Sequence, residues 1–465
     1  MLKFIIGFVL LFIPMLAQAQ TFEKKVLIPK PKENASRYFY VPFEVPENTK
    51  SITVSYEYSK ATGANVLDLG VFDSTEDEKK GFRGWSGGRR STIFISENQA
   101  TNGYVAGKIP AGTWRVILGL YKVKPEGVSA RISIKFNEIL NLPIETDNLI
   151  YSNNPKSKIQ NPKWFKGDLH THTFHSDGWW TAEGILSNAQ QNGLDFVAVT
   201  DHNTFSHHAE IDRIAPKYKD LLVLRGEEIT TYGGHVNVWG LPRDAWIDFR
   251  VTPKNTSQME NILTEAKRLN VPASINHPAA FCGGCDWSYG DDWDKFASVE
   301  IWNGEWDASD ELGLKKWDAL LQRGKRINII GSSDSHTPKN PIGLPTTHIG
   351  AKHLTQKDLF NAIYAGKVFI TENTQMSVGL SAGKTGIGEI LRAESNKEVN
   401  FKLNTKGFPT DAKVLIISDG TIIAENPGEN FALSFAKNTY LRLEIRDANG
   451  KILALTNPIY IQSSK

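Results

Sequence analysis

The stretch Lys166-Gly-Asp-Leu-His-Thr-His172 decides how the middle of the chain is interpreted. It places two histidines directly after the apolar end of an expected strand. Alternate side chains of a strand point the same way, so His170 and His172 can bind one metal ion together. Asp334 and His336 repeat this spacing further along the chain. Imidazole and carboxylate ligands together favour Zn, Mn, Fe or Ni ions over Ca.

Apolar strand patterns alternate with helical patterns around this stretch. The expected elements are strands at residues 195–200, 221–224, 272–275 and 327–330, and helices starting near 206, spanning about 257–269 and ending near 323. Near-continuous apolar strands between helices predict an α/β fold with a parallel sheet that is covered on its faces. The number of repeats favours a barrel over an open sheet.

Further polar motifs follow the expected strands. They are Thr200-Asp-His202, Gly226-Glu-Glu228, Asn276-His-Pro278 and Asp334-Ser-His336. In a parallel barrel the carboxyl ends of all strands share one face, where the loops build the active site. A single His-x-His motif would be explained by ordinary polar residues, but five motifs in chain order disfavour that explanation. A structural zinc site is also disfavoured, because such sites close with four ligands rich in Cys.

Six segments carry a resemblance to a known family. They are Asp168-Leu-His-Thr-His-Thr173, Ser176-Asp-Gly178, Val199-Thr-Asp-His-Asn203, Gly226-Glu-Glu228, Asn276-His-Pro278 and Gly331-Ser-Ser-Asp-Ser-His336. Their order and contexts resemble the polymerase and histidinol phosphatase (PHP) superfamily, and most of all its CehA/McbA-type metallohydrolases. The resemblance covers about residues 164–372. It implies a distorted (β/α)7 barrel of TIM type that holds two or three metal ions.

The resemblance also implies how the ligands are divided among the ions. The implied sets are His170, His172, Glu228 and Asp334 for the first ion, His235 and His277 with a bridging Glu228 for the second, and Asp177, His202 and His336 for the third. Glu227 stands beside Glu228, and strand alternation lets only one of them face the centre. The Gly-x-Glu spacing of the family selects Glu228.

These ligands also imply a reaction. The expected cofactors are two or three divalent ions, Zn, Mn or Fe, which acidify a bound water and stabilise the oxyanion that its attack creates. Glu228, His202 and Asp334 are the expected catalytic residues, since they balance the charge of the ions or assist the leaving group. Asp201 is expected to orient imidazoles from outside the ligand set.

The 465 residues exceed what one hydrophobic core ordinarily organises, so several domains are expected. Short alternating runs between Gly, Pro and Asn turns predict β-sandwiches at both ends. The expected segments are a signal peptide at 1–19, an N-terminal β-sandwich at 20–145, a linker at 146–163, the metallohydrolase barrel at 164–373 and a C-terminal β-sandwich at 374–465.

The first residues have the pattern of an export signal. Lys3 precedes an apolar run from Phe4 to Leu16, and Ala17-Gln-Ala19 forms a small-residue cleavage site. The alternative, an uncleaved membrane anchor, is disfavoured because the run is short. We therefore expect a periplasmic or secreted protein with no integral membrane segment after cleavage. The net charge of only +2 argues against a nucleic-acid partner.

The two cysteines of the chain stand in Cys282-Gly-Gly-Cys285. In an oxidising compartment a disulfide is expected, and the two glycines would let the chain turn tightly enough to close it. A redox-active pair and a zinc site completed by two other ligands are the alternatives.

The segment Arg83-Gly-Trp-Ser-Gly-Gly-Arg-Arg90 is unusually rich in Gly and Arg. Arg83, Arg89 and Arg90 could reach over the metal site and bind a phosphate with paired hydrogen bonds. The alternative is a solvated turn with exposed charges.

Aromatic residues and further histidines flank the motifs. Trp179 and Trp180 follow the Asp177 loop, where they either line an organic substrate pocket or pack between domains. His207 and His208 are expected on the surface of a helix rather than among the ligands.

Three functions are consistent with the sequence. The first is hydrolysis of a small phosphodiester or phosphomonoester, which the family resemblance and the Arg-rich loop favour. The second is hydrolysis of a carboxylic ester or carbamate, which the tryptophans would suit. The third is glycan binding by the sandwiches with an inert barrel, and it leaves the full ligand set without a purpose.

Overall fold

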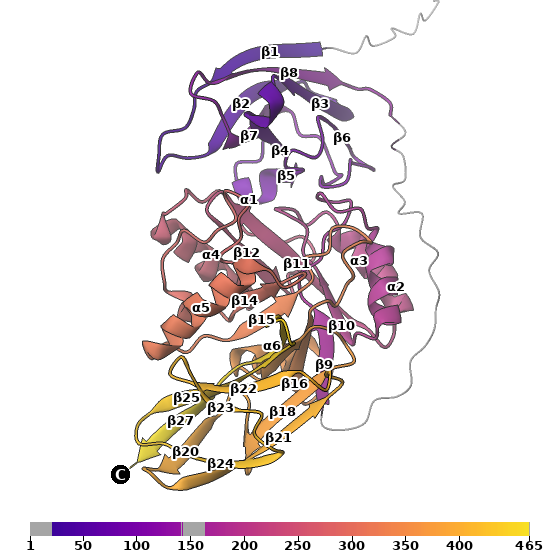
Figure 1. Ribbon diagram of the computed structural model, residues 1–465. Coiled ribbons are helices and arrows are strands. Elements are labelled where there is room, and N and C mark those ends of the chain that lie inside the picture. Colours follow the sequence, from indigo (N-terminus) through magenta and orange to yellow (C-terminus); the bar gives the residue numbers. More distant parts are fainter. Residues whose placement is uncertain (1–20, 141, 143–162, 465) are drawn as a thin grey trace, which may run out of the picture.

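The computed structural model describes residues 21–140, 142 and 163–464 (Figure 1). The predicted signal peptide at 1–19 and nearly all of the predicted linker at 146–163 lie outside the described residues. In Figure 1 the N-terminal strands, the central region and the C-terminal strands follow one another from top to bottom. No helix in the described part of the chain is long and apolar enough to cross a membrane.

The N-terminal region consists of two four-stranded antiparallel sheets. One sheet contains, in order, β1 (Thr21–Ile28), β8 (Val128–Phe136), β3 (Ser51–Tyr58) and β6 (Thr92–Ser96). The other contains β2 (Tyr38–Val45), β7 (Gly112–Lys122), β4 (Val66–Phe72) and β5 (Phe82–Trp85), with the short helix α1 (Glu78–Gly81) before β5. Alternate residues of β4, such as Leu67 and Leu69, are buried in the core of this region. By the same alternation Asp68 points the other way, toward the central region.

The central region alternates strands with helices. Its strands are, in sheet order, β15 (Ile329–Ser332), β14 (Ser298–Asn303), β13 (Ala273–Asn276), β12 (Gly234–Trp239), β11 (Leu222–Thr231), β10 (Phe196–Val199), β9 (Lys163–Asp168), β16 (Thr346–Ala351) and β17 (Val368–Thr371). Its helices are α2 (Ala182–Asn192), α3 (His208–Ile214), α4 (Thr256–Leu269), α5 (Ala308–Gln322) and α6 (Gln356–Tyr364). The chain is therefore mixed α/β, as predicted.

The central sheet is mixed rather than parallel throughout. β9, β10 and β11 are parallel neighbours, and so are β13, β14 and β15. β12 lies antiparallel to both β11 and β13 because the tight turn at Tyr232 and Gly233 connects it directly to β11. β16 likewise runs antiparallel to β9, and β17 runs antiparallel to β16. The expectation of a parallel sheet was therefore wrong at these three strands.

The loops that follow β9 and β15 meet, but no continuous hydrogen-bond ladder joins these two strands. A single parallel bridge joins Thr171, after β9, to Ser335, after β15. The amide of His172 donates to the carbonyl of Ser335 over 3.0 Å. Among the described strands these contacts close no barrel by regular pairing, so the (β/α)7 barrel stays a prediction. They do bring the loops that carry the His-x-His and Asp-x-His motifs side by side.

The C-terminal strands are continuous with the central sheet. β26 (Ile452–Thr456) pairs antiparallel with β17, and beyond it come β25 (Thr439–Arg446), β22 (Lys413–Ser418) and β23 (Thr421–Glu425). β27 (Ile459–Ser464) pairs with both β25 and β20 (Ile390–Glu394). A separate sheet contains β19 (Thr385–Gly386), β18 (Ser377–Ala382), β21 (Glu398–Lys406) and β24 (Asn430–Ser434).

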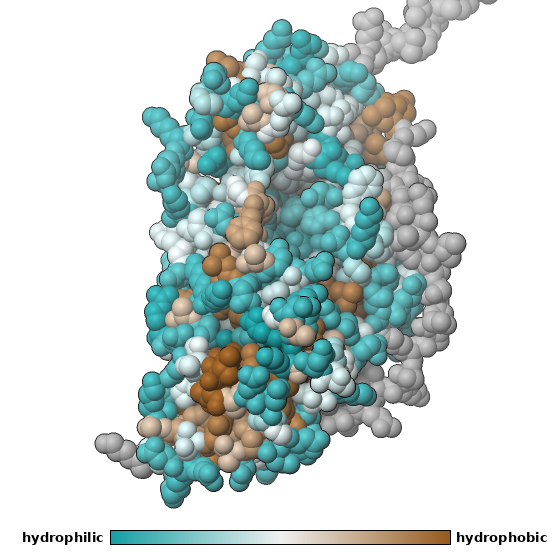
Figure 2. Space-filling model, viewed as in Figure 1, coloured by the Kyte–Doolittle hydropathy of each residue, from teal (hydrophilic) through white to brown (hydrophobic). Residues whose placement is uncertain are grey.

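The surface of the C-terminal strands carries an apolar patch. Figure 2 shows hydrophobic colour in the region of β22 and β23. Ile422 and Ile423 of the edge strand β23 are 54% and 41% exposed. Exposed apolar side chains are common on the surfaces of folded proteins, and this patch lies far along the chain from the ligand motifs.

The N-terminal sheet β2-β7-β4-β5 packs on the central region through aromatic side chains. The Tyr38 hydroxyl donates to the carbonyl of Phe249 over 3.1 Å, and the Trp246 indole donates to the carbonyl of Lys79 over 2.8 Å. The rings of Phe82 and Trp246 lie 4.1 Å apart. Burial of such large apolar side chains stabilises the contact, so the N-terminal region has a fixed position over the strand-end loops.

Candidate metal centre

All nine side chains predicted to bind metal lie at the strand ends that face the N-terminal region. They are His170 and His172 after β9, Asp177 in the loop before α2, His202 after β10, Glu228 on β11, His235 on β12, His277 after β13, and Asp334 and His336 after β15. The parallel strands on either side of β12 deliver their motifs to one face because their carboxyl ends point the same way.

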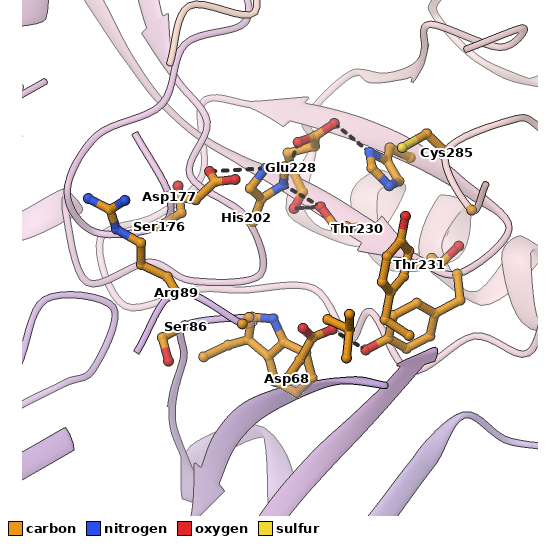
Figure 3. A pocket seen from close by; sticks show the side chains of 18 of the residues that line it. Asp68, Ser86, Arg89, Ser176, Asp177, His202, Glu228, Thr230, Thr231 and Cys285 are labelled. Carbon is orange, nitrogen blue, oxygen red and sulfur yellow. Dashed lines mark hydrogen bonds and ion pairs between the residues drawn. The ribbon is translucent and has the colours of Figure 1, made fainter. Parts of the chain in front are cut away.

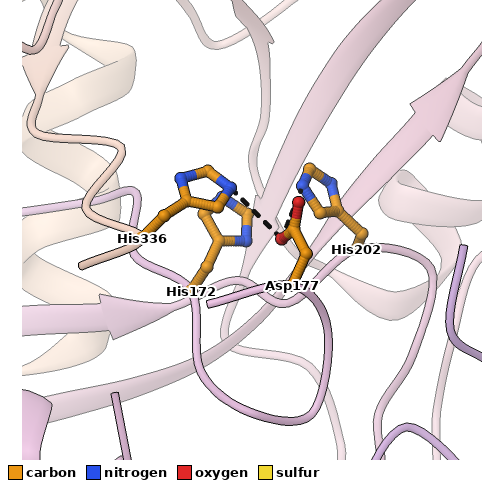
Figure 4. Close-up of side chains that lie close together, drawn as sticks. All are labelled: His172, Asp177, His202 and His336. Atoms are coloured by element: carbon orange, nitrogen blue, oxygen red, sulfur yellow. Dashed lines mark ion pairs between the residues drawn. The ribbon is translucent and has the colours of Figure 1, made fainter. Parts of the chain in front are cut away.

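Three groups of these side chains place ligand atoms within 4.8 Å of one another. The first is His172, Asp177, His202 and His336, which Figure 4 shows converging from three loops. In it the Asp177 carboxylate lies 3.4 Å from His202 Nε2 and 3.2 Å from His336 Nε2. One carboxylate among three imidazoles is a ligand set that Zn, Mn and Fe ions accept.

The other two groups share histidines with their neighbours. The second contains His170, His172 and Asp334, and the third contains His170, Glu228 and His277. Asp334 Oδ1 lies 2.9 Å from His172 Nε2 and 3.3 Å from His170 Nε2. Glu228 Oε1 lies 3.4 Å from His170 Nε2 and 3.3 Å from His277 Nε2. Shared members place the three groups side by side, as in a cluster of ions.

His235 joins this arrangement through Glu228 alone. Its Nδ1 lies 3.0 Å from Glu228 Oε1, and it belongs to none of the three groups. His202 reaches Glu228 from the opposite side, with 2.6 Å between Nδ1 and Oε2. Both oxygens of Glu228 are therefore surrounded by imidazoles, which is the environment expected of a bridging carboxylate.

The buried ligand atoms fit a metal better than they fit one another. His170 Nε2, His172 Nε2, Glu228 Oε2 and Asp334 Oδ1 are buried, and none has a hydrogen-bond partner of acceptable geometry among the described residues. Buried polar atoms without partners are rare because each costs about 1–3 kcal/mol. Several such atoms converging at one place indicate that a cation completes them.

The charges of the cluster also suit cation binding. Burial raises the pKa of the Glu228 carboxyl, but the charges of His202, His170 and His235 outweigh burial and hold that pKa well below its usual value. Burial, with the neighbouring His336 and His202, lowers the pKa of His172 to about 4. Glu228 is therefore an anion and His172 a neutral imidazole at neutral pH, which are the protonation states that bind metal.

Two of the ligands have a strained backbone. His277 has φ of 27° and Asp334 has φ of 49°, in the left-handed region that non-glycine residues seldom occupy. Strain of this kind costs of order 1–3 kcal/mol and persists where the surrounding structure enforces it. The carboxyl-end loops of β13 and β15 are thus held in shapes that aim His277 and Asp334 into the cluster.

Outer partners that sequence reasoning missed hold the ligands in place. Glu300 on β14 lies with Oε1 3.1 Å from His170 Nδ1, opposite the nitrogen that faces the cluster. The Asn276 amide donates to Glu228 Oε1 over 2.9 Å, and the Asn303 amide donates to Glu300 over 2.9 Å. Such partners fix the tautomer and orientation of a ligand. The signal available in the sequence for Glu300 was a carboxylate within the apolar strand Ser298–Asn303, and the structure buries it fully.

Asp201 was predicted to orient imidazoles, but most of its hydrogen bonds go to the loop that carries Asp177. Asp201 accepts hydrogen bonds from the Thr173 amide over 2.7 Å and from the Thr173 and Ser176 hydroxyls over 2.6 Å each. These bonds organise the loop that presents Asp177. The only imidazole in reach among the described residues is that of His207, with Nδ1 3.2 Å from Asp201 Oδ2.

Strand alternation separates the two adjacent glutamates. Glu227 points away from the cluster and accepts a hydrogen bond from the Ile247 amide over 2.8 Å. Burial raises the pKa of the Glu227 carboxyl well above the usual value. No cation is among the described groups that act on this carboxyl, so none lowers its pKa. Glu228 is the one that faces the centre.

A cavity of about 500 Å³ opens beside the cluster (Figure 3). The central region contributes ligands such as Asp177, His202 and Asp334. The N-terminal sheet contributes Asp68, Trp85, Tyr121 and the loop Ser86–Arg89. A small molecule in this cavity would contact both regions, and Figure 3 shows Asp68 across the cavity from Glu228.

Comparisons with known proteins give weak likenesses. No family model matches the chain, and no curated protein matches it. A two-domain protein of Bacteroides vulgatus, described as containing a predicted PHP-like metal-dependent phosphoesterase, is 16% identical, with a TM-score of 0.40, over 66% of this chain and 100% of that one. An amidohydrolase of Chromobacterium violaceum with bound sulfate and no metal is 15% identical, with a TM-score of 0.28, over 38% of this chain and 89% of that one. Neither likeness is strong enough to place the chain in a family.

Of the three arginines predicted to bind substrate, only Arg89 lines the cavity. The prediction that Arg83 binds substrate was wrong. Arg83 is buried, pairs with Asp73 at 3.4 Å and donates to the carbonyl of Val105. The prediction that Arg90 binds substrate was also wrong. Its guanidinium donates to the carbonyl of Phe174 over 2.7 Å and connects the N-terminal loop to the central region. Arg89 stacks on Trp179, with 4.4 Å between the guanidinium carbon and the ring centre.

Of the two tryptophans after Asp177, one is buried and the other is exposed. Trp180 is 1% exposed and donates from its indole to the Ser335 hydroxyl over 2.9 Å. It is a core residue, so its prediction as a substrate contact was wrong. Trp179 is 55% exposed and lies under Arg89, outside the cavity wall itself.

The surface placement of His207 and His208 was also wrong. Both are fully buried, and each lies with Nε2 3.1 Å from the carbonyl oxygen of Gly226. They support the strand end that precedes Glu228. Neither belongs to a candidate ligand group in the described part of the chain.

Cys282 and Cys285 are joined by a disulfide, as predicted. The Tyr121 hydroxyl of the N-terminal region donates to the carbonyl of Cys282 over 2.6 Å. The disulfide loop follows His277 and forms part of the cavity wall through Gly284 and Cys285. It therefore shapes the cavity beside the ligand cluster.

Proposed function

We propose that this chain is an exported metal-dependent hydrolase with a PHP-type barrel of the CehA/McbA kind. We further propose that it holds two or three divalent ions, Zn, Mn or Fe. The observation that supports this best is the convergence of nine candidate imidazole and carboxylate ligands, some with buried atoms that lack partners, beside a cavity that seven of them line. A purely glycan-binding chain would have no use for that convergence.

Bound ions would supply a water acidic enough to ionise near neutral pH. The residues of the chain do the remaining work. Glu228 and Asp334 bring the negative charge that balances the ions, and His202 lies between Glu228 and Asp177, linking the two ligand carboxylates. Glu300 keeps His170 in one orientation through its Nδ1.

A phosphodiester or phosphomonoester is the substrate class that we favour. Arg89 is the one arginine on the cavity wall among the described residues, and its stacking on Trp179 fixes the plane of its guanidinium. A fixed guanidinium can donate two parallel hydrogen bonds to phosphate oxygens. This pairing would complement ions held by the ligand cluster.

Hydrolysis of a carboxylic ester or carbamate is the second candidate. The cavity wall includes the aromatic side chains Trp85, Tyr121 and Tyr232, which suit an aryl group. In that case Arg89 would contribute little to binding a neutral substrate.

Two measurements test the proposal. Elemental analysis of protein purified gently with Mn or Zn should find at least two ions per chain, and one or none would sink the multinuclear site. The metal-loaded protein should then hydrolyse 4-nitrophenyl phosphodiesters or phosphomonoesters faster than 4-nitrophenyl carboxylic esters. The reverse order would favour the second candidate, and no turnover of any of these would overturn both.

A further inference from the structure

Asp68 is the one carboxylate on the cavity wall that lies outside the ligand set. Four carboxyl groups line the cavity, and Asp177, Glu228 and Asp334 belong to the candidate ligand groups. Asp68 comes from β4 of the N-terminal sheet and faces these ligands across the cavity (Figure 3). A substrate held at the cluster, with its leaving group directed across the cavity, would place that group beside Asp68.

Asp68 is held in this position by the central region. The Tyr232 hydroxyl, from the turn between β11 and β12, donates to Asp68 Oδ2. Tyr232 reaches between the strands of the N-terminal sheet because Gly119 leaves room, since a Cβ at Gly119 would clash with the hydroxyl. The two regions thus interlock at this pair.

The surroundings of Asp68 keep its carboxyl available for proton transfer. Among the described residues no lysine or arginine forms an ion pair with it, and Tyr232 is its one hydrogen-bond partner. Burial raises the pKa of Asp68 to about 6, against the lowering effects of Tyr232 and of the His202 charge. A carboxyl of this kind is partly protonated near neutral pH, as a general acid requires.

Other groups on the wall are less suited to protonate a substrate. Arg89 does not release its proton in proteins. The Tyr121 hydroxyl is engaged with the carbonyl of Cys282. The imidazoles His202, His235, His277 and His336 face the ligand carboxylates. Asp68 is the remaining acid.

We infer that Asp68 of the N-terminal sheet is the general acid that protonates the leaving group of the substrate, with Tyr232 as its positioning residue. The inference rests on the proposed hydrolase function. Water attacks phosphorus, or a carbonyl carbon, and the bond to the leaving oxygen breaks with its electron pair staying on that oxygen. The Asp68 proton goes to the leaving oxygen. The attacking water gives up one proton to solvent, and solvent returns a proton to Asp68.

The dependence of the rate on the leaving group tests this role. Metal-loaded wild type, Asp68→Asn and Tyr232→Phe would be compared on methyl aryl phosphodiesters whose leaving groups range from 4-nitrophenol to phenol. A parallel series of aryl acetates covers the second candidate. A good leaving group departs without a proton, so Asp68→Asn should lose less than about 3-fold on the 4-nitrophenyl compound and about 100-fold or more on the phenyl compound.

The controls separate this role from a structural one. Tyr232→Phe should show the same trend with a smaller loss, because the acid remains but is less well placed. Glu57→Gln, an exposed carboxylate on the outer sheet, should leave both series unchanged. Metal content and thermal unfolding of Asp68→Asn should match wild type, and if this variant does not fold, the trend in Tyr232→Phe decides.

The outcomes distinguish the inference from the function on which it rests. Equal losses of Asp68→Asn on all leaving groups would show a binding role and overturn the inference, as would no loss. Turnover of neither series by wild type would overturn the proposed function and the inference with it. Normal wild-type turnover with parallel leaving-group slopes would overturn the inference alone.

Discussion

Two buried charged clusters in this chain differ in how completely they are paired. In the C-terminal region Arg442 donates to Asp318 over 2.8 Å and to Glu444 over 2.6 Å, and the Tyr440 hydroxyl donates to Asp318 over 2.9 Å. None of the buried atoms in this cluster lacks a partner in the described structure. In the strand-end cluster, ligand atoms of four described side chains are buried without partners.

The difference separates a structural cluster from a functional one. The Arg442 cluster contains its own cation, so it is complete and fastens β25 to α5. The strand-end cluster gathers carboxylates and imidazoles without any lysine or arginine among its members. Burial alone therefore does not mark a site, whereas unpartnered burial of one kind of ligand does.

The largest expected effect comes from removing the central ligand. Glu228→Gln should lose bound metal and lower kcat by more than about 100-fold, beyond the loss typical of outer partners. The isosteric amide keeps the shape of the side chain, so the fold should persist. Elemental analysis, steady-state kinetics and circular dichroism check this. Full activity with a full metal complement would refute the assignment of Glu228.

The paired cluster should behave in the opposite way. Arg442→Met leaves Asp318 buried without its cation and Glu444 with Arg446 alone, and should lower the free energy of unfolding by about 3–5 kcal/mol. Its metal content should match wild type. Chemical denaturation measures the loss. The double variant Arg442→Met with Asp318→Asn should recover part of it, because it also removes the unpaired charge, and a double variant as unstable as the single one would contradict the explanation.

Removing the metal should destabilise the chain to an intermediate degree. Ligands that bind only the folded state stabilise it by about 2.7 kcal/mol at 100 times Kd. Treatment with a chelator should therefore lower Tm, and adding Zn or Mn should restore it. Glu228→Gln should show a much smaller response to chelator, because it has already lost metal. An equal fall in Tm in both proteins would place the metal elsewhere.

The smallest effect distinguishes the two neighbouring arginines. Arg89→Ala should lower kcat/KM on anionic phosphate esters by about 10-fold or more, the size expected for hydrogen bonds to a charged group. Neutral esters should be spared. Arg90→Ala is the matched control, since its guanidinium contacts the carbonyl of Phe174 instead of the cavity. Equal kinetics of Arg89→Ala and wild type on phosphate esters would remove the support that Arg89 gives to a phosphoesterase.

The strand-end ligands could be anticipated from sequence because the signal is local. Alternation on a strand places His170 beside His172 and separates Glu228 from Glu227, whatever the rest of the chain does. The mixed direction of the sheet at β12 could not be anticipated, since it depends on a turn of two residues that the apolar pattern does not reveal.

The residues around the ligands were harder to predict because tertiary packing decides their roles. Arg83 and Trp180 have the chemistry of substrate contacts, yet both are buried by segments distant in sequence. Asp68 and Glu300 carried no motif of their own. Their importance arises only when the N-terminal sheet and β14 are brought against the strand ends.

The pairing of β17 with β26 imposes an order on how the chain can mature. β17 leaves the site of synthesis before residues 372–451, and only then does β26 follow to cover its edge. Until that moment the central sheet ends in exposed amide and carbonyl groups that any other extended chain can join. The last strands thus cover the open edge of the central sheet. A nascent chain that stalls before β26 would expose this edge to pairing with other chains, although all of its metal ligands have already been synthesised.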